Sequence, residues 1–140
     1  MDESKVILEH LNKNFKYVYD KNAYGKRDAW YVMKQLPFEG DCEDYSLTYL
    51  YEVSGRSYIK MFWNLIFGGY KIKFCTVRGE GHAVLRYKER YLDNIQKEWC
   101  RKDYLEDKGY DFHKSQYWWN IVAVKLIQGW YYSASKKIRD

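Results

Sequence analysis

Three residues that together can perform nucleophilic catalysis occur along the chain in the order cysteine, histidine, aspartate. They are Cys42, His82 and Asp93. A thiol attacks a carbonyl carbon only as the thiolate, a nearby imidazole can take its proton, and a carboxylate can fix the imidazole tautomer. The order therefore predicts Cys42 as a nucleophile, His82 as its base and Asp93 as the residue that orients the histidine.

A helix that begins at Cys42 would favour the thiolate. Asp41 is a good N-cap residue, and Asp44 follows three positions later, as in a capping box. Cys42 is then the first helical residue, where backbone N–H groups and the helix dipole stabilise an anion. The same N–H groups could form part of an oxyanion hole. Gly55 is expected to end this helix.

The strand that contains His82 and the strand before Asp93 predict how these two residues meet. If a two-residue turn places Tyr87 opposite Arg90, Asp93 lies opposite Val84 and diagonal to His82, within reach of its side chain. A slip of one residue would send Asp93 to the other face of the sheet. The turn would be a Lys-Glu pair, which is not a favoured hairpin turn, so a bulge could replace it.

Hydrophobic periodicity predicts the other elements, with helices first and strands after them. Helices are expected at 4–19, 28–36, 42–54 and 57–67, a loop at 19–26, and strands at 70–77, 82–87, 91–94 and 120–127. This order predicts an α+β fold with an antiparallel sheet packed on the Cys42 helix. With one proline and no linker, residues 1–140 are expected to form a single domain.

Three blocks around these residues resemble the signature blocks of the bacterial transglutaminase-like cysteine proteinases. The blocks are Gly40 to Leu47, Gly81 to Leu85 and Tyr91 to Asn94, and the resemblance covers roughly residues 10–95. It implies a papain-like core in which Cys42 attacks an acyl carbon, His82 acts as base and then acid, and Asp93 fixes the imidazole. Compact proteins of this type from bacteriophages and prophages also look similar, which suggests a viral or accessory origin.

The resemblance also implies a calcium site beside the nucleophile, onto which Asp41 and Glu43 map. Negative charge near a thiol raises its pKa, and a hard cation held by these carboxylates would remove that effect. The alternative is that the carboxylates only cap the helix and complement its dipole. Further ligands must come from elsewhere in the chain, and no other cofactor is expected.

The predicted triad leaves more than one function open. A cysteine peptidase or amidase would resolve its acyl-enzyme with water, whereas a transglutaminase would resolve it with an amine, and the same triad serves a deamidase. A third hypothesis is a non-catalytic binding module that uses a basic, aromatic surface. The aromatic C-terminal third has no motif of the family, so the adhesin substrate of some members is not carried over.

Composition limits the partners. The net charge is +5, and 16 Tyr, 6 Trp and 6 Phe supply a large core. We expect a protein or peptide substrate, no nucleic-acid partner and no membrane partner, because no segment is apolar enough to span a bilayer. Three cysteines without paired spacing, and the lack of a visible signal peptide, predict the cytoplasm, which would be a host cytoplasm for a phage protein. The oligomeric state is left open.

Overall fold

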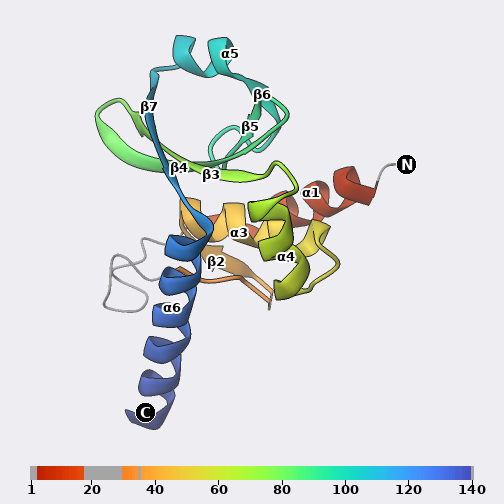
Figure 1. The fold of residues 1–140 in the computed structure, drawn as a ribbon, viewed down its shortest axis with the longest axis vertical. Coiled ribbons are helices and arrows are strands. Elements are labelled where there is room, and N and C mark those ends of the chain that lie inside the picture. Colours follow the sequence, from red (N-terminus) through yellow and green to blue (C-terminus); the bar gives the residue numbers. More distant parts are fainter. Residues whose placement is uncertain (1–2, 18–29, 35, 140) are drawn as a thin grey trace.

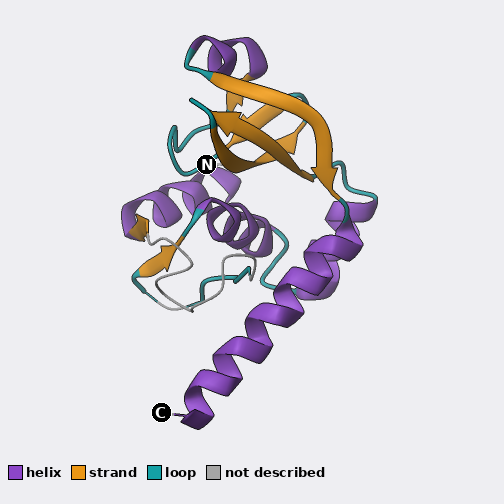
Figure 2. Cartoon of the chain, turned by 90° about the vertical axis from the view of Figure 1, so that its left-hand side faces the viewer, coloured by secondary structure: helices purple, strands orange, loops and turns teal. Residues whose placement is uncertain are grey.

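The protein has a mixed α+β fold, seen in a computed structural model that describes residues 3–17, 30–34 and 36–139. A curled antiparallel sheet lies over a layer of helices, and the longest helix runs down from the sheet past that layer (Figure 1). Figure 2 shows the same arrangement from the side. The predicted α+β fold, with an antiparallel sheet packed on the Cys42 helix, is confirmed at this level.

Helix α3 (Cys42–Val53) is the centre of the helical layer, between α1 (Glu3–Asn14) and α4 (Tyr58–Ile66). Most of its side chains are buried, because it packs against the sheet on one side and against other helices around it. The predicted end is also confirmed, since Gly55 follows α3 with a φ of +72°, which glycine adopts without strain.

The predicted capping box at the start of α3 is confirmed. The Asp41 side chain accepts the backbone N–H of Asp44, and the Asp44 side chain accepts the backbone N–H of Asp41. Glycine before the cap allows this close packing, because a Cβ on Gly40 would lie 2.7 Å from the Asp44 Cβ and 2.9 Å from the Met33 sulfur. The start of α3 is therefore fixed by both hydrogen bonds and close packing.

Five strands form the main sheet in the order β6-β5-β4-β3-β7, and every neighbouring pair is antiparallel. The strands predicted at 70–77, 82–87 and 91–94 correspond to β3, β4 and β5, whereas β6, β7 and the helix between them have no counterpart in the sequence prediction. Their bounds are β3 (Lys71–Val77), β4 (Glu80–Tyr87), β5 (Arg90–Leu92), β6 (Cys100–Arg101), α5 (Lys102–Asp107) and β7 (Tyr110–Tyr117).

The hairpin of β4 and β5 has the register that the triad hypothesis requires. Tyr87 pairs with Arg90, and the ladder ends where Leu85 pairs with Leu92. The turn residues Lys88 and Glu89 have φ values of 49° and 64°, and two positive φ angles are typical of a type I′ hairpin turn. A tight turn rather than a bulge therefore makes this connection, although neither residue favours that conformation.

Strand β4 is covered on both faces, since His82 and the three residues after it are all buried. Ala83 and Leu85 belong to the core between the sheet and α3. Val84 belongs to a second core, enclosed by the curled sheet and α5, which also contains Tyr110. A strand buried on both faces reads as a continuous apolar run, which explains its sequence.

The first predicted helix is shorter than expected. Helix α1 ends at Asn14, and Phe15 to Tyr17 form β1, which pairs in parallel with β2 (Phe38–Gly40). The prediction of helix to residue 19 is therefore wrong for 15–17, because strand pairing replaces the helical continuation. Residues 18–19 and the predicted loop at 19–26 lie outside the described residues.

The helix predicted at 28–36 is wrong in its described part, since residues 30–34 are not helical. The backbone N–H of Tyr31 donates to Asp44 Oδ1 at 2.8 Å, and that of Met33 donates to Thr48 Oγ1 at 2.8 Å. Asp44 and Thr48 are one helical turn apart on the same face of α3, so their side chains bind this extended segment at two successive points. These tertiary bonds replace the local bonds of a helix.

The strand predicted at 120–127 is also wrong, because this region lies in α6 (Trp119–Arg139). Val122, Leu126 and Gly129 are its buried residues among those whose side chains are described, and their spacings of four and three mark a helical face. A Cβ on Gly129 would lie 2.3 Å from the carbonyl oxygen of Trp30, so glycine allows this close approach. Among the described residues, no helix is both long enough and apolar enough to cross a bilayer.

Candidate active site

His82 and Asp93 are in direct contact, although 11 positions separate them in the sequence. His82 Nε2 lies 2.9 Å from Asp93 Oδ2, and both side chains are buried. Asp93 directly follows β5, so continuing the ladder by one pair beyond Leu85 and Leu92 places it opposite Val84, diagonal to His82. Because Asp93 engages Nε2, the nitrogen left to exchange a proton with a nucleophile is Nδ1.

Asp93 also accepts two further hydrogen bonds. The Tyr110 hydroxyl donates to Oδ2, and the backbone N–H of Gln96 donates to Oδ1 at 2.8 Å. Burial on its own would raise the pKa of Asp93, but the bonds from His82, Tyr110 and Gln96 outweigh it and hold the pKa below its usual value. The carboxylate therefore stays ionised, as a residue that orients an imidazole must.

A second set of contacts holds the loop that follows Asp93. Asn12, on α1, accepts a hydrogen bond from the Tyr45 hydroxyl on α3 and donates from its amide to the carbonyl oxygen of Lys97 at 2.8 Å. The backbone N–H of Lys97 in turn donates to the carbonyl oxygen of Asp93 at 3.0 Å. This chain of bonds connects the carboxylate loop to the two helices beneath it, so it fixes where Asp93 lies relative to α3.

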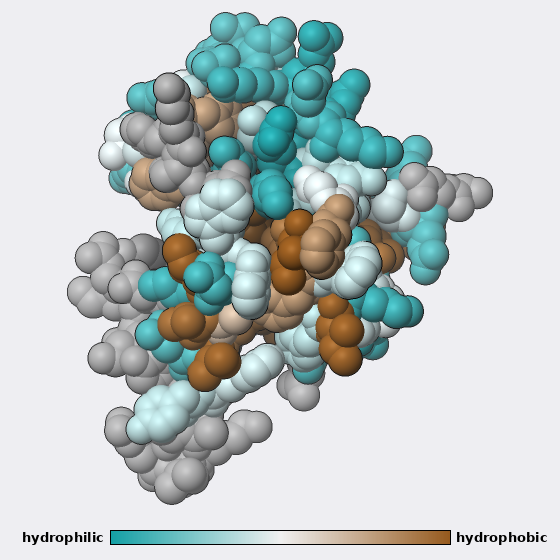
Figure 3. All heavy atoms as spheres, viewed as in Figure 1, coloured by the Kyte–Doolittle hydropathy of each residue, from teal (hydrophilic) through white to brown (hydrophobic). Residues whose placement is uncertain are grey.

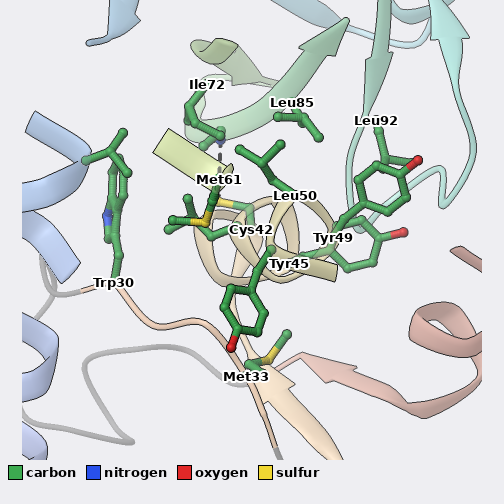
Figure 4. Packing of buried hydrophobic residues seen from close by; sticks show 14 of the residues in the cluster. Trp30, Met33, Cys42, Tyr45, Tyr49, Leu50, Met61, Ile72, Leu85 and Leu92 are labelled. Carbon is green, nitrogen blue, oxygen red and sulfur yellow. Dashed lines mark hydrogen bonds between the residues drawn. The ribbon is translucent and has the colours of Figure 1, made fainter. Parts of the chain in front are cut away.

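Cys42 is the first residue of α3, and its sulfur reaches the edge of β4. The backbone N–H of Ala83, the residue after His82, donates to Cys42 Sγ at 3.4 Å. This contact is made beyond the last ladder pair of β4 and β5, so the sulfur lies where the pairing with β5 has stopped, while β4 is still paired with β3 at Ala83. Figure 4 shows Cys42 at the start of the helix with its side chain directed toward the sheet.

The environment of Cys42 opposes ionisation of the thiol. The side chain is only 8% exposed, and its burial raises the thiol pKa well above the ordinary value. The charges of Glu43 and Asp41 raise the pKa further, and the thiol donates to Glu43 Oε2 at 3.1 Å. The hydrogen bond from Ala83 acts in the opposite direction and is outweighed. Burial and the neighbouring carboxylates therefore dominate over the stabilisation predicted for a thiolate at the helix N-terminus, and the opposing effect of the carboxylates is itself predicted from the sequence.

The structure thus brings two of the three predicted residues, His82 and Asp93, into direct contact and places Cys42 against the backbone of the neighbouring residue, Ala83. The first two residues come from the sheet and the cysteine comes from the helical layer. Their catalytic roles remain predictions, since a hydrogen-bonded arrangement by itself does not establish turnover.

The residues predicted to hold calcium supply only part of a site. Asp41 is engaged as the helix cap, and Glu43 accepts the thiol hydrogen bond. Among the described residues, no group of three or more His, Cys, Asp or Glu side chains is placed to hold a metal ion. Calcium takes six to eight oxygen ligands, so these two carboxylates do not make a calcium site alone.

Two contributors to the site were not predicted from the sequence. Tyr110 lies 17 positions after Asp93 and is one of 16 tyrosines, so no local pattern distinguishes it. The hydrogen bond that Glu43 accepts from the thiol is the second, since the sequence predicts Glu43 as a candidate calcium ligand and as a charge that raises the thiol pKa but not as a hydrogen-bond acceptor. A cavity of about 470 Å³ lies between the sheet and α5, away from the predicted triad. Its lining includes Arg86, Tyr91 and Arg101.

Comparison with known proteins finds no protein-family model and no curated protein that matches the chain.

Proposed function

We propose that the protein is a cysteine hydrolase of the transglutaminase-like type, a peptidase or amidase that acts through a Cys42 acyl-enzyme. The observation that carries the proposal is the pair of contacts at the start of β4. His82 Nε2 lies 2.9 Å from Asp93 Oδ2, and the next residue, Ala83, donates its N–H to the Cys42 sulfur. A papain-like core and a transglutaminase-like family are part of this proposal.

In the proposed reaction, His82 takes the thiol proton through Nδ1, and the thiolate attacks the acyl carbon of a peptide or isopeptide bond. The protonated imidazole gives its proton to the departing amine, leaving a thioester. Water deprotonated by His82 then attacks the thioester, which releases the acid and restores the thiol. Asp93 stabilises the imidazolium during both steps. The Cys42 backbone N–H, at the first position of α3, is available to stabilise the oxyanion.

One further event must accompany catalysis. In the resting arrangement the thiol donates to Glu43, and its pKa is raised by burial and by the charges of Glu43 and Asp41. The proton must therefore move toward His82 as the substrate binds, and neutralising Glu43 would assist that transfer. A substrate that supplies a cationic group, or a bound cation, would have the same effect on the thiol.

A second candidate is a binding module without turnover, which the raised pKa of the buried Cys42 thiol favours. A thiol that stays protonated at neutral pH is a poor nucleophile. On this hypothesis the protein would bind its partner equally well after Cys42→Ala, and the sulfur would be a structural group of the core. Thiol reactivity therefore decides between the two candidates.

The test is labelling with iodoacetamide across pH, with the site of modification located by mass spectrometry. We expect selective modification of Cys42 in the folded protein, a loss of roughly tenfold or more in His82→Ala, and a severalfold gain near neutral pH in Glu43→Gln. Glu39→Gln, an exposed carboxylate on β2, is the matched control and should leave the rate unchanged. Labelling of Cys42 that is indifferent to His82 would overturn the enzyme proposal.

Once reactivity is established, the acceptor is identified with a protein substrate and a primary amine. Hydrolysis gives new carboxyl ends, whereas transamidation adds the mass of the amine to the substrate. The labelling is also repeated with calcium and with a chelator. These measurements test whether a cation at Asp41 and Glu43 raises the rate of Cys42 labelling as Glu43→Gln is expected to do. Incorporation of the amine as the main product would replace hydrolysis by transamidation as the reaction of the same site.

A further inference from the structure

The outer surfaces of α4 and α6 are apolar although they face solvent. Trp63 is 63% exposed on α4, and Ile127 is 58% exposed on α6. The exposed side chains of each helix recur at intervals of three or four residues, which places them on one face opposite its buried residues. We call this surface the α4–α6 face, and its residues are Ile59, Trp63, Phe67, Ile121, Val124 and Ile127.

The two helices lie side by side, so their apolar residues form one surface. Tyr58 at the start of α4 contacts Trp130 of α6, with ring centroids 5.3 Å apart. Near the other end of α4, the Lys71 amine donates to the carbonyl oxygen of Leu65 at 3.0 Å and lies 6.0 Å from the Trp118 ring centroid. Figure 3 shows apolar side chains gathered over both helices, while the sheet end of the same view is hydrophilic.

The charged residues carried by the two helices themselves have one sign. No Asp or Glu occurs between Glu52 and Glu80, a stretch that contains α4, or from residue 112 to 139, a stretch that contains α6. The second stretch has five Lys and Arg residues, which equals the net charge of +5, so the rest of the chain is balanced. Lys60 on α4 and Lys125 on α6 thus accompany the apolar residues with no acid on either helix.

This combination selects the kind of partner. A second copy of the chain would bring the same lysines together without an opposing carboxylate, and like charges in contact disfavour association. A partner with an anionic surface and an apolar interior suits both the positive charge and the exposed apolar side chains of the two helices. Exposed tryptophans together with lysines on amphipathic helices are typical of protein surfaces that lie at a bilayer interface. We propose that the α4–α6 face docks onto the surface of a bilayer that contains anionic lipids.

The docking does not depend on the catalytic proposal, because the face contains none of Cys42, His82 and Asp93. The sequence predicts no membrane partner because no segment spans a bilayer, but docking at the surface needs no spanning segment. The apolar side chains enter the region between head groups and acyl chains, while the lysine amines remain at the phosphate level.

The test measures co-sedimentation of the full chain with vesicles of phosphatidylcholine, with or without phosphatidylglycerol. We expect binding to the anionic vesicles that is weakened roughly tenfold by Ile127→Ser, which removes one large apolar side chain from the contact. Ile95→Ser is the matched control, because Ile95 is 51% exposed but lies in the loop after β5, and its binding should equal that of the wild type. Circular dichroism verifies that both variants are folded.

The electrostatic part has its own pair of variants. Lys60→Gln should weaken binding to anionic vesicles by about fivefold, because one lysine amine near an anionic surface raises the affinity by about that amount. Lys5→Gln, at an exposed position of α1, should have no effect. Equal binding to neutral and anionic vesicles would overturn the proposal. Lack of vesicle binding, with a dimer in solution that Ile127→Ser dissociates, would also overturn it and assign the face to a second copy.

Discussion

Asp93 accepts hydrogen bonds from three groups that lie far apart in the sequence: the His82 ring, the Tyr110 hydroxyl and the Gln96 amide. The last of these is local and would form in any turn of this kind. The Tyr110 bond is different, because it connects the carboxylate to the opposite edge strand of the sheet, β7. Tyr110 therefore acts on His82 through Asp93 and is a positioning residue for the candidate site.

Tyr110→Phe is expected to raise the pKa of Asp93, because the lost hydroxyl stabilises the ionised carboxylate. A carboxyl ¹³C NMR titration of Asp93 would measure the change directly. The rate of Cys42 labelling should fall by about fivefold, which corresponds to the net contribution of one hydrogen bond.

The control for this variant is Tyr91→Phe, a buried tyrosine in the same core as Tyr110. It should leave the Asp93 titration unchanged. If Tyr110→Phe altered stability but not the titration of Asp93, the phenol would be a packing residue only.

At the scale of elements, the start of α3 determines where the sulfur lies. The backbone at Gly40 lies very close to Asp44. A Cβ added at Gly40 would lie only 2.7 Å from the Asp44 Cβ. The Asp44 side chain cannot move away without losing hydrogen bonds, because one of its carboxylate oxygens accepts the N–H of Asp41 and the other accepts the N–H of Tyr31. The capping box and the extended segment are thus coupled through one carboxylate.

Gly40→Ala should lower the free energy of unfolding by about 1–3 kcal/mol, the usual cost of overpacking a well-filled core. Urea unfolding followed by circular dichroism measures this change. Gly81→Ala is the matched control, since its new Cβ would lie 3.5 Å from the Phe74 ring, which is an ordinary contact. Its change should stay within about 0.5 kcal/mol. Equal changes in both variants would contradict the packing argument.

Local signals predicted several elements correctly. The cap at Asp41 and the glycine after α3 depend on a few neighbouring residues, so the sequence contains the information needed to place that helix. The hairpin of β4 and β5 was predictable for the same reason, because its alternating pattern and its length permit few registers. The contact between His82 and Asp93 follows from that register.

Other elements depend on tertiary contacts that local patterns do not reveal. The segment at 30–34 has apolar residues that suit a helix, but Asp44 and Thr48 of α3 take its N–H groups. The stretch from Asn120 to Ile127 is rich in β-branched residues, which favour a strand, yet the spacing of Val122 and Leu126 places them on the buried face of a helix. Tyr110 could not be distinguished because its partner is set by the curl of the sheet.

At the scale of the whole molecule, the ionised Asp93 links folding to pH. The pKa of Asp93 is lowered in the folded state, whereas an unfolded aspartate titrates near pH ~3.9. The group therefore stabilises the fold fully above about pH 4, and this contribution is lost as the pH falls through the folded-state pKa.

Asp93→Asn should destabilise the protein by about 2 kcal/mol at pH 7, since hydrogen bonds to a charged group are among the stronger ones. The difference from wild type should shrink from about pH 4 downward, because the unfolded wild-type chain then binds a proton at Asp93 while the folded state still resists protonation. Urea unfolding of both proteins at several pH values tests this. A difference that is the same at pH 7 and at pH 3 would show that the charge of Asp93 does not contribute.

The division of the site between two layers has a mechanical consequence. The imidazole, the carboxylate and the phenol all belong to the sheet side, while the sulfur belongs to a helix beneath it. A small sliding of α3 against β4 would separate the sulfur from the Ala83 N–H beside the imidazole and leave both layers intact. The rate of Cys42 alkylation therefore reports how well the two layers are aligned. Under mild denaturant, we expect this rate to fall before the sheet unfolds.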